Sequence, residues 1–158
     1  MSVSVGQPVP DFSVTATGDR TVRLSALRGR RVVLYFYPKD HTPGCTVEGQ
    51  QFRDLHDRFA ALNVLVFGVS RDTLRSHENF RAKHGLPFHL LADTDETLCE
   101  LFEVLKLKKL YGKESIGVER STFLIDENGV LRREWRKVKA DGHAETVLAA
   151  IEAGAEAP

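Results

Sequence analysis

An unbroken apolar run, Val32–Tyr37, constrains the fold of this chain more than any other feature of its sequence. The run is rich in β-branched and aromatic residues and stops at Pro38, which is typical of a strand. Successive side chains of a strand point to opposite faces, so a strand that is apolar at every position is buried on both. We therefore interpret Val32–Tyr37 as the central strand of a sheet that helices cover on both faces.

The rest of the chain alternates between strand and helix patterns. Further strands are expected at Asp11–Ala16, Thr21–Leu24, Val64–Ser70, Phe88–Leu91, Thr122–Ile125 and Val130–Trp135. Helices are expected from Pro43 to about Ala60, at Thr73–His84, at Glu96–Phe102 and from Asp141 or Gly142 to Glu152, with one further turn that Ser25 caps and Gly29 ends. Turns at Gly18-Asp19 and Asp126–Gly129 join neighbouring strands into hairpins. The pattern predicts an α/β fold with a mixed central sheet, flanking helices and an N-terminal β-hairpin.

Length and composition are those of a single globular domain. The chain has 158 residues, of which 42% are hydrophobic and 28% charged. We expect one domain over residues 1–158, with a frayed tail at 153–158. Lysine plus arginine balance aspartate plus glutamate at 22 each, which argues against nucleic acid or an anionic membrane as the main partner.

Targeting signals and cysteine usage indicate the compartment. No apolar run approaches the roughly 20 residues of a membrane helix, and the first residues lack the basic start and apolar core of a signal peptide. The two cysteines, Cys45 and Cys99, are too few for a disulfide framework. We expect a cytoplasmic protein in which both cysteines are thiols at rest.

Cys45 stands where a strand passes into a long helix. Thr42 is a good helix N-cap and Pro43 suits the first helical position, so Cys45 takes the third. Unpaired backbone N–H groups and the helix dipole favour a thiolate there, and the same N–H groups can bind substrate oxygens. The thiolate is the reactive form of cysteine. The alternative is a buried, inert cysteine, which is common in proteins.

Several motifs resemble those of the peroxiredoxins. Pro38, Thr42 and Cys45 match the pattern Pro-x-x-x-Thr-x-x-Cys, and the string from 35 to 48 resembles the bacterioferritin comigratory protein subfamily, also called peroxiredoxin Q. Other similar segments are Pro10–Phe12, Leu24–Gly29, Gly68–Ser70 and Arg120–Asp126. The resemblance extends from about Val5 to Ile151. It implies a thioredoxin-like fold and a thiol peroxidase that acts on hydroperoxides.

The resemblance also implies roles for the residues around the cysteine. Cys45 would be the peroxidatic nucleophile, and Thr42 would hydrogen-bond both the peroxide and the thiolate through its hydroxyl. Pro38 would shield the pocket from bulk water. The backbone N–H groups of Gly44 and Cys45 would help to bind the peroxide oxygens.

Two charged residues complete the expected site. The resemblance makes Arg120 the active-site arginine, whereas the sequence alone favours a surface arginine before a buried strand. Glu48 lies three residues after Cys45, on the same helix face, and would hold an arginine in place; its alternative is a solvated helix charge.

The sequence departs from part of the subfamily in its second cysteine. Many relatives carry a resolving cysteine five residues after the first, where this chain has Gln50, and others carry it in the next helix, where residues 73–84 contain none. Cys99 is the remaining candidate, but its apolar neighbours favour a core position. We therefore predict a one-cysteine cycle with an external reductant: thioredoxin, glutaredoxin or a small thiol. An atypical two-cysteine enzyme that resolves through Cys99 is the alternative. A monomer is expected, as is common in the subfamily.

Three other functions are weighed against this one. A thioredoxin-type dithiol enzyme needs a second cysteine at the position of Glu48. A zinc site on His41 and Cys45 has no further clustered ligands, so we expect neither metal nor cofactor. A non-catalytic binding module of the same fold would not need the Thr-Pro-Gly-Cys arrangement. The other histidines are expected at the surface or as helix caps: His56, His77, His84, His89 and His143.

Overall fold

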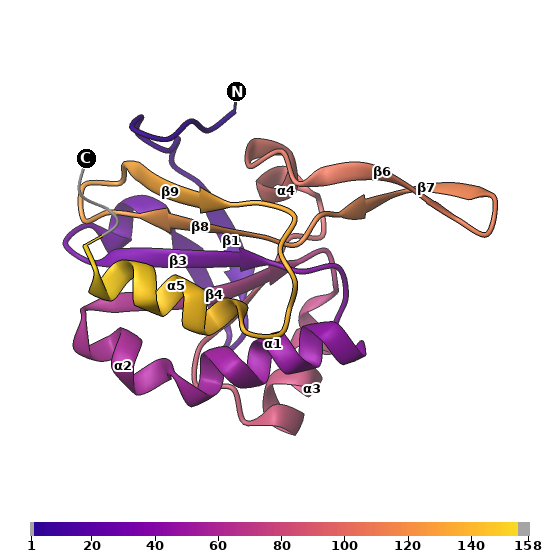
Figure 1. The fold of residues 1–158 in the computed structure, drawn as a ribbon, viewed down its shortest axis with the longest axis horizontal. Coiled ribbons are helices and arrows are strands. Elements are labelled where there is room, and N and C mark those ends of the chain that lie inside the picture. Colours follow the sequence, from indigo (N-terminus) through magenta and orange to yellow (C-terminus); the bar gives the residue numbers. More distant parts are fainter. Residues whose placement is uncertain (1, 155–158) are drawn as a thin grey trace.

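The computed structural model describes residues 2–154, and its centre is a seven-stranded mixed sheet (Figure 1). The strand order is β2-β1-β5-β4-β3-β8-β9. The strands are β1 (Ser13–Ala16), β2 (Arg20–Arg23), β3 (Arg31–Phe36), β4 (Val64–Ser70), β5 (Leu90–Ala92), β8 (Ser121–Ile125) and β9 (Leu131–Trp135). The last four residues of the tail expected at 153–158 lie outside the described part of the chain.

The apolar run forms the central strand, as predicted. β3 pairs in parallel with β4 and antiparallel with β8. Val33 and Tyr35 point into one apolar core, and Val32, Leu34 and Phe36 point into the other. The strand is thus buried on both faces, and its carboxyl end leads directly to the segment that contains Cys45.

Helices lie on both faces of this sheet (Figure 1). They are α1 (Pro43–Asp54), α2 (His56–Ala61), α3 (Leu74–His84), α4 (Thr97–Leu101) and α5 (His143–Glu152), with a 3₁₀ turn η1 (Leu24–Leu27). Helices α1, α2, α3 and α5 contribute to one core, whereas α4 packs into the other beside the β1–β2 hairpin. No helix of the described residues is both long and apolar enough to span a bilayer.

The long helix expected from Pro43 to Ala60 is two helices. Leu55 separates α1 from α2 with backbone angles of φ −98° and ψ 2°. Its carbonyl still accepts hydrogen bonds from the N–H groups of Arg58 and Phe59, so the two helices follow each other with a change of direction. Phe52 of α1 and Phe59 of α2 both reach the same core, with ring centroids 5.8 Å apart. Burial of both aromatic rings therefore accompanies the break.

The turn after β2 is not capped by Ser25, contrary to the prediction. Arg23 takes the cap position of η1, and no side chain caps it. Ser25 instead donates its backbone N–H and its hydroxyl to the carboxylate of Asp11, at 2.8 and 2.9 Å. These bonds hold the segment before β1 against η1. The other predicted elements are present, with ends that differ by a few residues at most.

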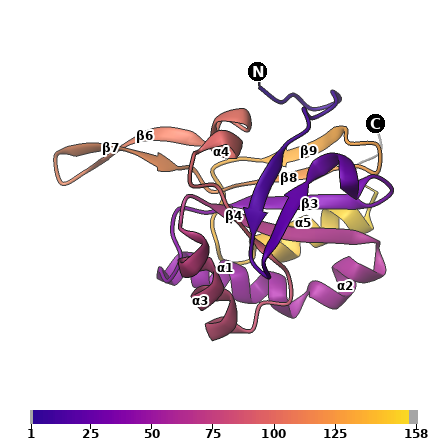
Figure 2. The same cartoon turned by 180° about the vertical axis from the view of Figure 1, so that it is seen from behind.

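A hairpin that the sequence patterns did not predict projects from the body of the protein (Figures 1 and 2). Strands β6 (Leu105–Leu110) and β7 (Lys113–Val118) form a separate two-stranded sheet. Tyr111 and Gly112 join them, and both have positive φ, as a tight hairpin turn requires. Leu107 and Ile116 face each other across the two strands and are exposed.

Candidate active site

Cys45 lies in the first turn of α1, directly beyond the carboxyl end of β3. Pro43 is the first residue of the helix, so the cysteine occupies the third position, as the sequence indicates. Its side chain faces the core that α1 shares with α5, and only 2% of the residue is exposed. The sulfur therefore sits at a helix N-terminus with little contact with bulk water, where the helix dipole favours negative charge.

Sheet register brings Arg120 to this sulfur. Tyr35 and Phe36 of β3 face Thr122 and Ser121 of β8, so Arg120, one residue earlier, comes level with the start of the loop to α1. Its Nη2 lies 3.5 Å from Cys45 Sγ. A Cβ atom on Gly44 would lie only 3.2 Å from the same Nη2. The absence of a side chain at position 44 thus permits the guanidinium to reach the sulfur.

Glu48 holds the other side of the guanidinium. Arg120 Nη1 donates to Glu48 Oε1 at 2.5 Å, and the glutamate is fully buried. Burial raises the pKa of Glu48 to about 7, although the positive charge of Arg120 acts in the opposite direction. Burial also disfavours the charged form of Arg120, but Glu48 and Cys45 outweigh it and hold the pKa of the arginine above its ordinary value. Glu48 Oε2 has no hydrogen-bond partner among the described residues.

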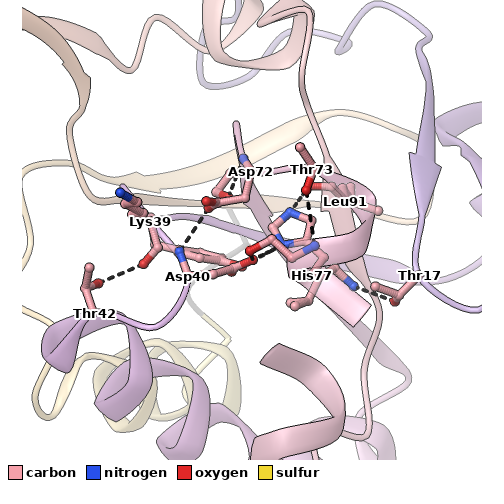
Figure 3. Close-up of polar contacts among 12 residues, drawn as sticks. Thr17, Lys39, Asp40, Thr42, Asp72, Thr73, His77 and Leu91 are labelled. Carbon is pink, nitrogen blue, oxygen red and sulfur yellow. Dashed lines mark hydrogen bonds and ion pairs between the residues drawn. The ribbon is translucent and has the colours of Figure 1, made fainter. Parts of the chain in front are cut away.

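Thr42 occupies the N-cap position of α1 without acting as a cap. Its hydroxyl donates to the carbonyl of Lys39 at 2.7 Å rather than accepting from a helix N–H (Figure 3). The prediction of a side-chain cap is wrong for this reason, whereas the backbone carbonyl of Thr42 accepts the first helical bond, from Thr46. Pro38 is half-buried at the start of the same loop. The structure places neither side chain in a hydrogen bond with the sulfur.

A buried polar cluster anchors the loop between β3 and α1 (Figure 3). Asp40 accepts hydrogen bonds from the hydroxyl of Tyr37 at 2.6 Å and from that of Ser76 at 2.9 Å. His77 Nδ1 lies 2.7 Å from Asp40 Oδ2, and its Nε2 donates to the carbonyl of Leu91 at 2.9 Å. The bond from His77 is among the effects that lower the pKa of Asp40, against the effect of burial. The loop is therefore attached both to α3 and to β5.

Sequence patterns did not reveal this cluster, and the surface or helix-cap position expected for His77 is wrong. His77 is fully buried, because both ring nitrogens have partners in the interior. The sequence feature that could have indicated this cluster is Asp40, an acidic residue between a buried strand and a helix. The side-chain ligand atoms of Asp40, Asp72 and His77 also lie within 4.8 Å of one another. Both oxygens of Asp40 already accept hydrogen bonds, so the group acts as a hydrogen-bonded anchor.

His143 is a second buried histidine, whereas a surface or helix-cap position was expected; Gly142, not His143, is the N-cap of α5. It is 5% exposed, and its Nε2 lies 2.8 Å from the hydroxyl of Thr122. Burial and the nearby charge of Arg120 lower the pKa of His143 to about 4, so the ring is neutral near pH 7. His56, His84 and His89 are half-buried.

Cys99 lies on the other side of the sheet. It belongs to the core that contains Phe36 and Phe102, whereas Cys45 belongs to the opposite core. The backbone N–H of Cys99 donates to Asp93 Oδ2 at 2.8 Å. Burial and the Asp93 carboxylate raise the pKa of the Cys99 thiol far above its ordinary value. The structure thus brings Arg120, Glu48 and Gly44 to Cys45 and leaves Cys99 apart.

Comparison with known proteins assigns this geometry to a family. The family model described as AhpC/TSA family matches residues 5–134. The chain belongs to the AhpC/TSA family. Peroxiredoxin Bcp of Bacillus subtilis is 51% identical over 148 residues, which are 94% of each chain, and peroxiredoxin Bcp of Xanthomonas campestris is 48% identical over 146 residues, or 92% of this chain and 91% of its own.

Solved structures of relatives support the assignment of this protein to the AhpC/TSA family. A structure of the X. campestris bacterioferritin comigratory protein, from work on its alkyl peroxide reduction activity, superposes with a TM-score of 0.90 at 45% identity and covers 96% of this chain and 99% of its own. X. campestris peroxiredoxin Q gives a TM-score of 0.89 at 46% identity, with 96% and 98% covered.

These relatives confirm the predicted resemblance to the peroxiredoxin Q subfamily and the thioredoxin-like fold. The protein is a thiol peroxidase, and its reaction needs a peroxide substrate and a thiol reductant.

Proposed function

We propose that this peroxiredoxin reduces hydrogen peroxide and organic hydroperoxides with Cys45 as the peroxidatic nucleophile. The observation that supports the assignment is the contact of Cys45 Sγ with Arg120 Nη2 at the N-terminus of α1. Helix dipole and guanidinium both favour the thiolate, which is the nucleophilic form of cysteine. Cys99 also lies in the first turn of a helix, α4, but burial and the carboxylate of Asp93 raise the pKa of its thiol.

The first half of the reaction is an in-line displacement at oxygen. The Cys45 thiolate attacks the terminal oxygen of the hydroperoxide, an S–O bond forms and the O–O bond breaks. The departing hydroxide or alkoxide takes up a proton and leaves as water or an alcohol, while Cys45 becomes a sulfenic acid. Sulfur is oxidised by two electrons and the peroxide is reduced by two.

Neighbouring groups would stabilise the charge that moves onto the oxygens. Arg120 is positioned by Glu48 and already contacts the sulfur, so it would also contact a peroxide bound there. The backbone N–H groups of Gly44 and Cys45 have no partner within the first helical turn and would donate to the same oxygens. Thr42 would turn its hydroxyl from the carbonyl of Lys39 towards the substrate, and Pro38 would exclude bulk water.

The second half of the reaction would use an external thiol. One thiol condenses with the sulfenic acid to give a mixed disulfide and water, and a second thiol releases Cys45 as the reduced thiol. The separation of the two cysteines into different cores supports this one-cysteine cycle. A Cys45–Cys99 bridge would need Cα atoms within about 7 Å, so a helix or strand between them would have to move. Thioredoxin, glutaredoxin or a small thiol is the proposed reductant, for a monomer in the cytoplasm.

Steady-state turnover and mass spectrometry test this assignment together. Peroxide consumption is followed with dithiothreitol and, separately, with thioredoxin and its reductase, for the wild type, Cys45→Ser and Cys99→Ser. We expect no turnover in Cys45→Ser and wild-type turnover in Cys99→Ser. Peroxide-treated wild type should trap a sulfenic acid reagent on Cys45. An intramolecular disulfide as the main oxidised product, together with a loss of turnover in Cys99→Ser, would favour the two-cysteine alternative. Normal turnover in Cys45→Ser would overturn the assignment altogether.

A further inference from the structure

The central sheet has an opening between β4 and the β1–β2 hairpin. β5 is only three residues long, and its pairing with β4 begins at Gly68. The preceding residues of β4, up to Phe67, have no strand partner on that side within the described chain. A cavity of about 340 Å³ lies at this opening. None of the residues placed around Cys45 lines it.

The inner wall of this cavity is apolar. Leu65, Val66 and Phe67 all line it, although consecutive side chains of a strand point to opposite faces. The cavity therefore opens in the plane of the sheet, at the edge of β4. Val22 and Phe88, which are buried, extend the same apolar wall.

The rim of this cavity carries positive charge that has no ion-pair partner in the described chain. Arg20, Arg23 and Arg30 line the cavity and are exposed. Arg30 donates to the side-chain oxygen of Asn63 at 3.1 Å, while Arg20 and Arg23 have no hydrogen-bond or ion-pair partner among residues 2–154. No carboxylate lines the cavity.

Nearby charges do not cancel this rim. Asp11 is close enough to Arg23 for the arginine to contribute to its lowered pKa, but its carboxylate accepts hydrogen bonds from Ser25. Glu78 accepts from the backbone N–H of Gly18. His89 also lines the cavity, and burial, with the nearby charges of Arg81 and Arg20, lowers its pKa, which disfavours a positive charge on the ring. The three arginines therefore supply the permanent positive charge of the cavity, which His56 also lines.

We propose that this cavity binds an organic anion with an apolar chain, such as a carboxylate or a phosphate monoester. The guanidinium groups match the oxygens of either headgroup, and the apolar wall would cover the chain. An inorganic anion would leave the wall in contact with water, and a neutral apolar ligand would leave the arginines without a partner. The volume lies at the lower end of the range for small-molecule sites, about 300–1,000 Å³. The site is independent of the peroxidase reaction.

Calorimetric titration with matched ten-carbon probes tests the proposal. Decanoate and decyl phosphate supply the two anionic headgroups, and decanol and decyltrimethylammonium supply a neutral and a cationic one, all below micelle formation. We expect one molecule of at least one anion to bind, at least tenfold more tightly than either control probe. Binding of decanoate alone or of decyl phosphate alone would support the proposal and identify the headgroup. Equal binding of all four probes, or binding of none, would overturn it.

Variants locate the binding to this cavity. The double change Arg20→Gln and Arg23→Gln removes rim charge, and Ala26→Trp fills the cavity while leaving every charge in place. Each should weaken anion binding at least tenfold, whereas Arg75→Gln, an exposed arginine of α3 outside the cavity, should not. All variants should keep wild-type turnover with dithiothreitol, which shows that they fold. Unchanged anion binding in the double variant, or equal weakening in Arg75→Gln, would contradict the assigned site.

Discussion

Replacing Glu48 by glutamine should change how the stability of the protein depends on pH. The pKa of this carboxyl rises from 4.5 to about 7 on folding, because the group is fully buried. Between these values the folded state keeps a proton that the unfolded state has released. The stabilisation linked to this proton is therefore complete below pH 4.5 and is lost as the pH rises towards 7. Glutamine keeps the shape of the side chain but does not titrate.

The size of the effect follows from the same two pKa values. Each pH unit in this interval changes the free energy of unfolding by about 1.4 kcal/mol for one proton. Over the interval from 4.5 to about 7, the wild type should lose roughly 3 kcal/mol relative to Glu48→Gln. His143 titrates in the opposite sense, since its lowered pKa makes stability increase from about pH 4 to 6.5. That contribution is common to both proteins and cancels in the difference.

Urea unfolding at pH 4.5, 5.5, 6.5 and 7.5 measures this difference. The free energy of unfolding of the wild type minus that of Glu48→Gln should fall steadily across the series and level off near neutral pH. Glu100→Gln, at an exposed position of α4, gives the baseline for an ordinary change of glutamate to glutamine. A difference that stays constant across the whole range would refute the reasoning, since Glu48 would then titrate alike in the folded and unfolded states.

Four further expectations concern the site and its loop. Arg120→Met should lower kcat/KM for peroxide by about 10²–10³-fold, the usual effect of removing one donor to developing charge; a loss below tenfold would remove Arg120 from the mechanism. Gly44→Ala should lower peroxidase activity by displacing the guanidinium while thermal stability stays within a few degrees, and unchanged activity would show that the guanidinium can shift without effect. His77→Leu should destabilise the protein by about 2–3 kcal/mol, because the buried carboxylate of Asp40 and the carbonyl of Leu91 lose a hydrogen-bond partner; denaturant unfolding measures this, and a change under 1 kcal/mol would contradict the anchoring role. Amide hydrogen exchange across residues 42–50 should accelerate when Cys45 is oxidised, because a buried sulfenic acid must become accessible to a thiol; equal protection in both forms would exclude this opening.

Local sequence patterns predicted the parts of the fold that local chemistry determines. The run Val32–Tyr37 is apolar at every position, so its burial on both faces follows from strand geometry alone. The Thr-Pro step before Cys45 predicts where α1 begins, because Pro43 suits only the first turn of a helix. Arg120 could be assigned to the site only from the family resemblance. Its approach to the sulfur depends on the pairing of β8 with β3, which local sequence patterns do not show.

Features that depend on contacts between distant residues could not be predicted from local patterns. In the sequence, His77 is one polar residue of a highly charged helix. Its burial can be explained only by its contacts with Asp40 and Leu91, which are distant in the sequence. The break at Leu55 accompanies the packing of Phe52 and Phe59. The spacing of apolar residues along the sequence does not show such a break. The β6–β7 hairpin was missed although Leu105–Lys108 alternates between apolar and polar residues, because most side chains of β7 are exposed and give little hydrophobic pattern.

In the proposed one-cysteine cycle, the separation of the two sulfurs onto opposite faces of the sheet would limit how the enzyme survives excess oxidant. In that cycle no internal thiol forms a disulfide with the oxidised Cys45, so its sulfenic acid would have two fates: reduction by a thiol from solution, or reaction with a second peroxide to give the irreversible sulfinic acid. The working lifetime of each molecule would then depend on the relative rates of two bimolecular reactions of the sulfenic acid, one with a thiol and one with peroxide. A cell that runs short of reducing equivalents would inactivate this catalyst in proportion to the peroxide it meets.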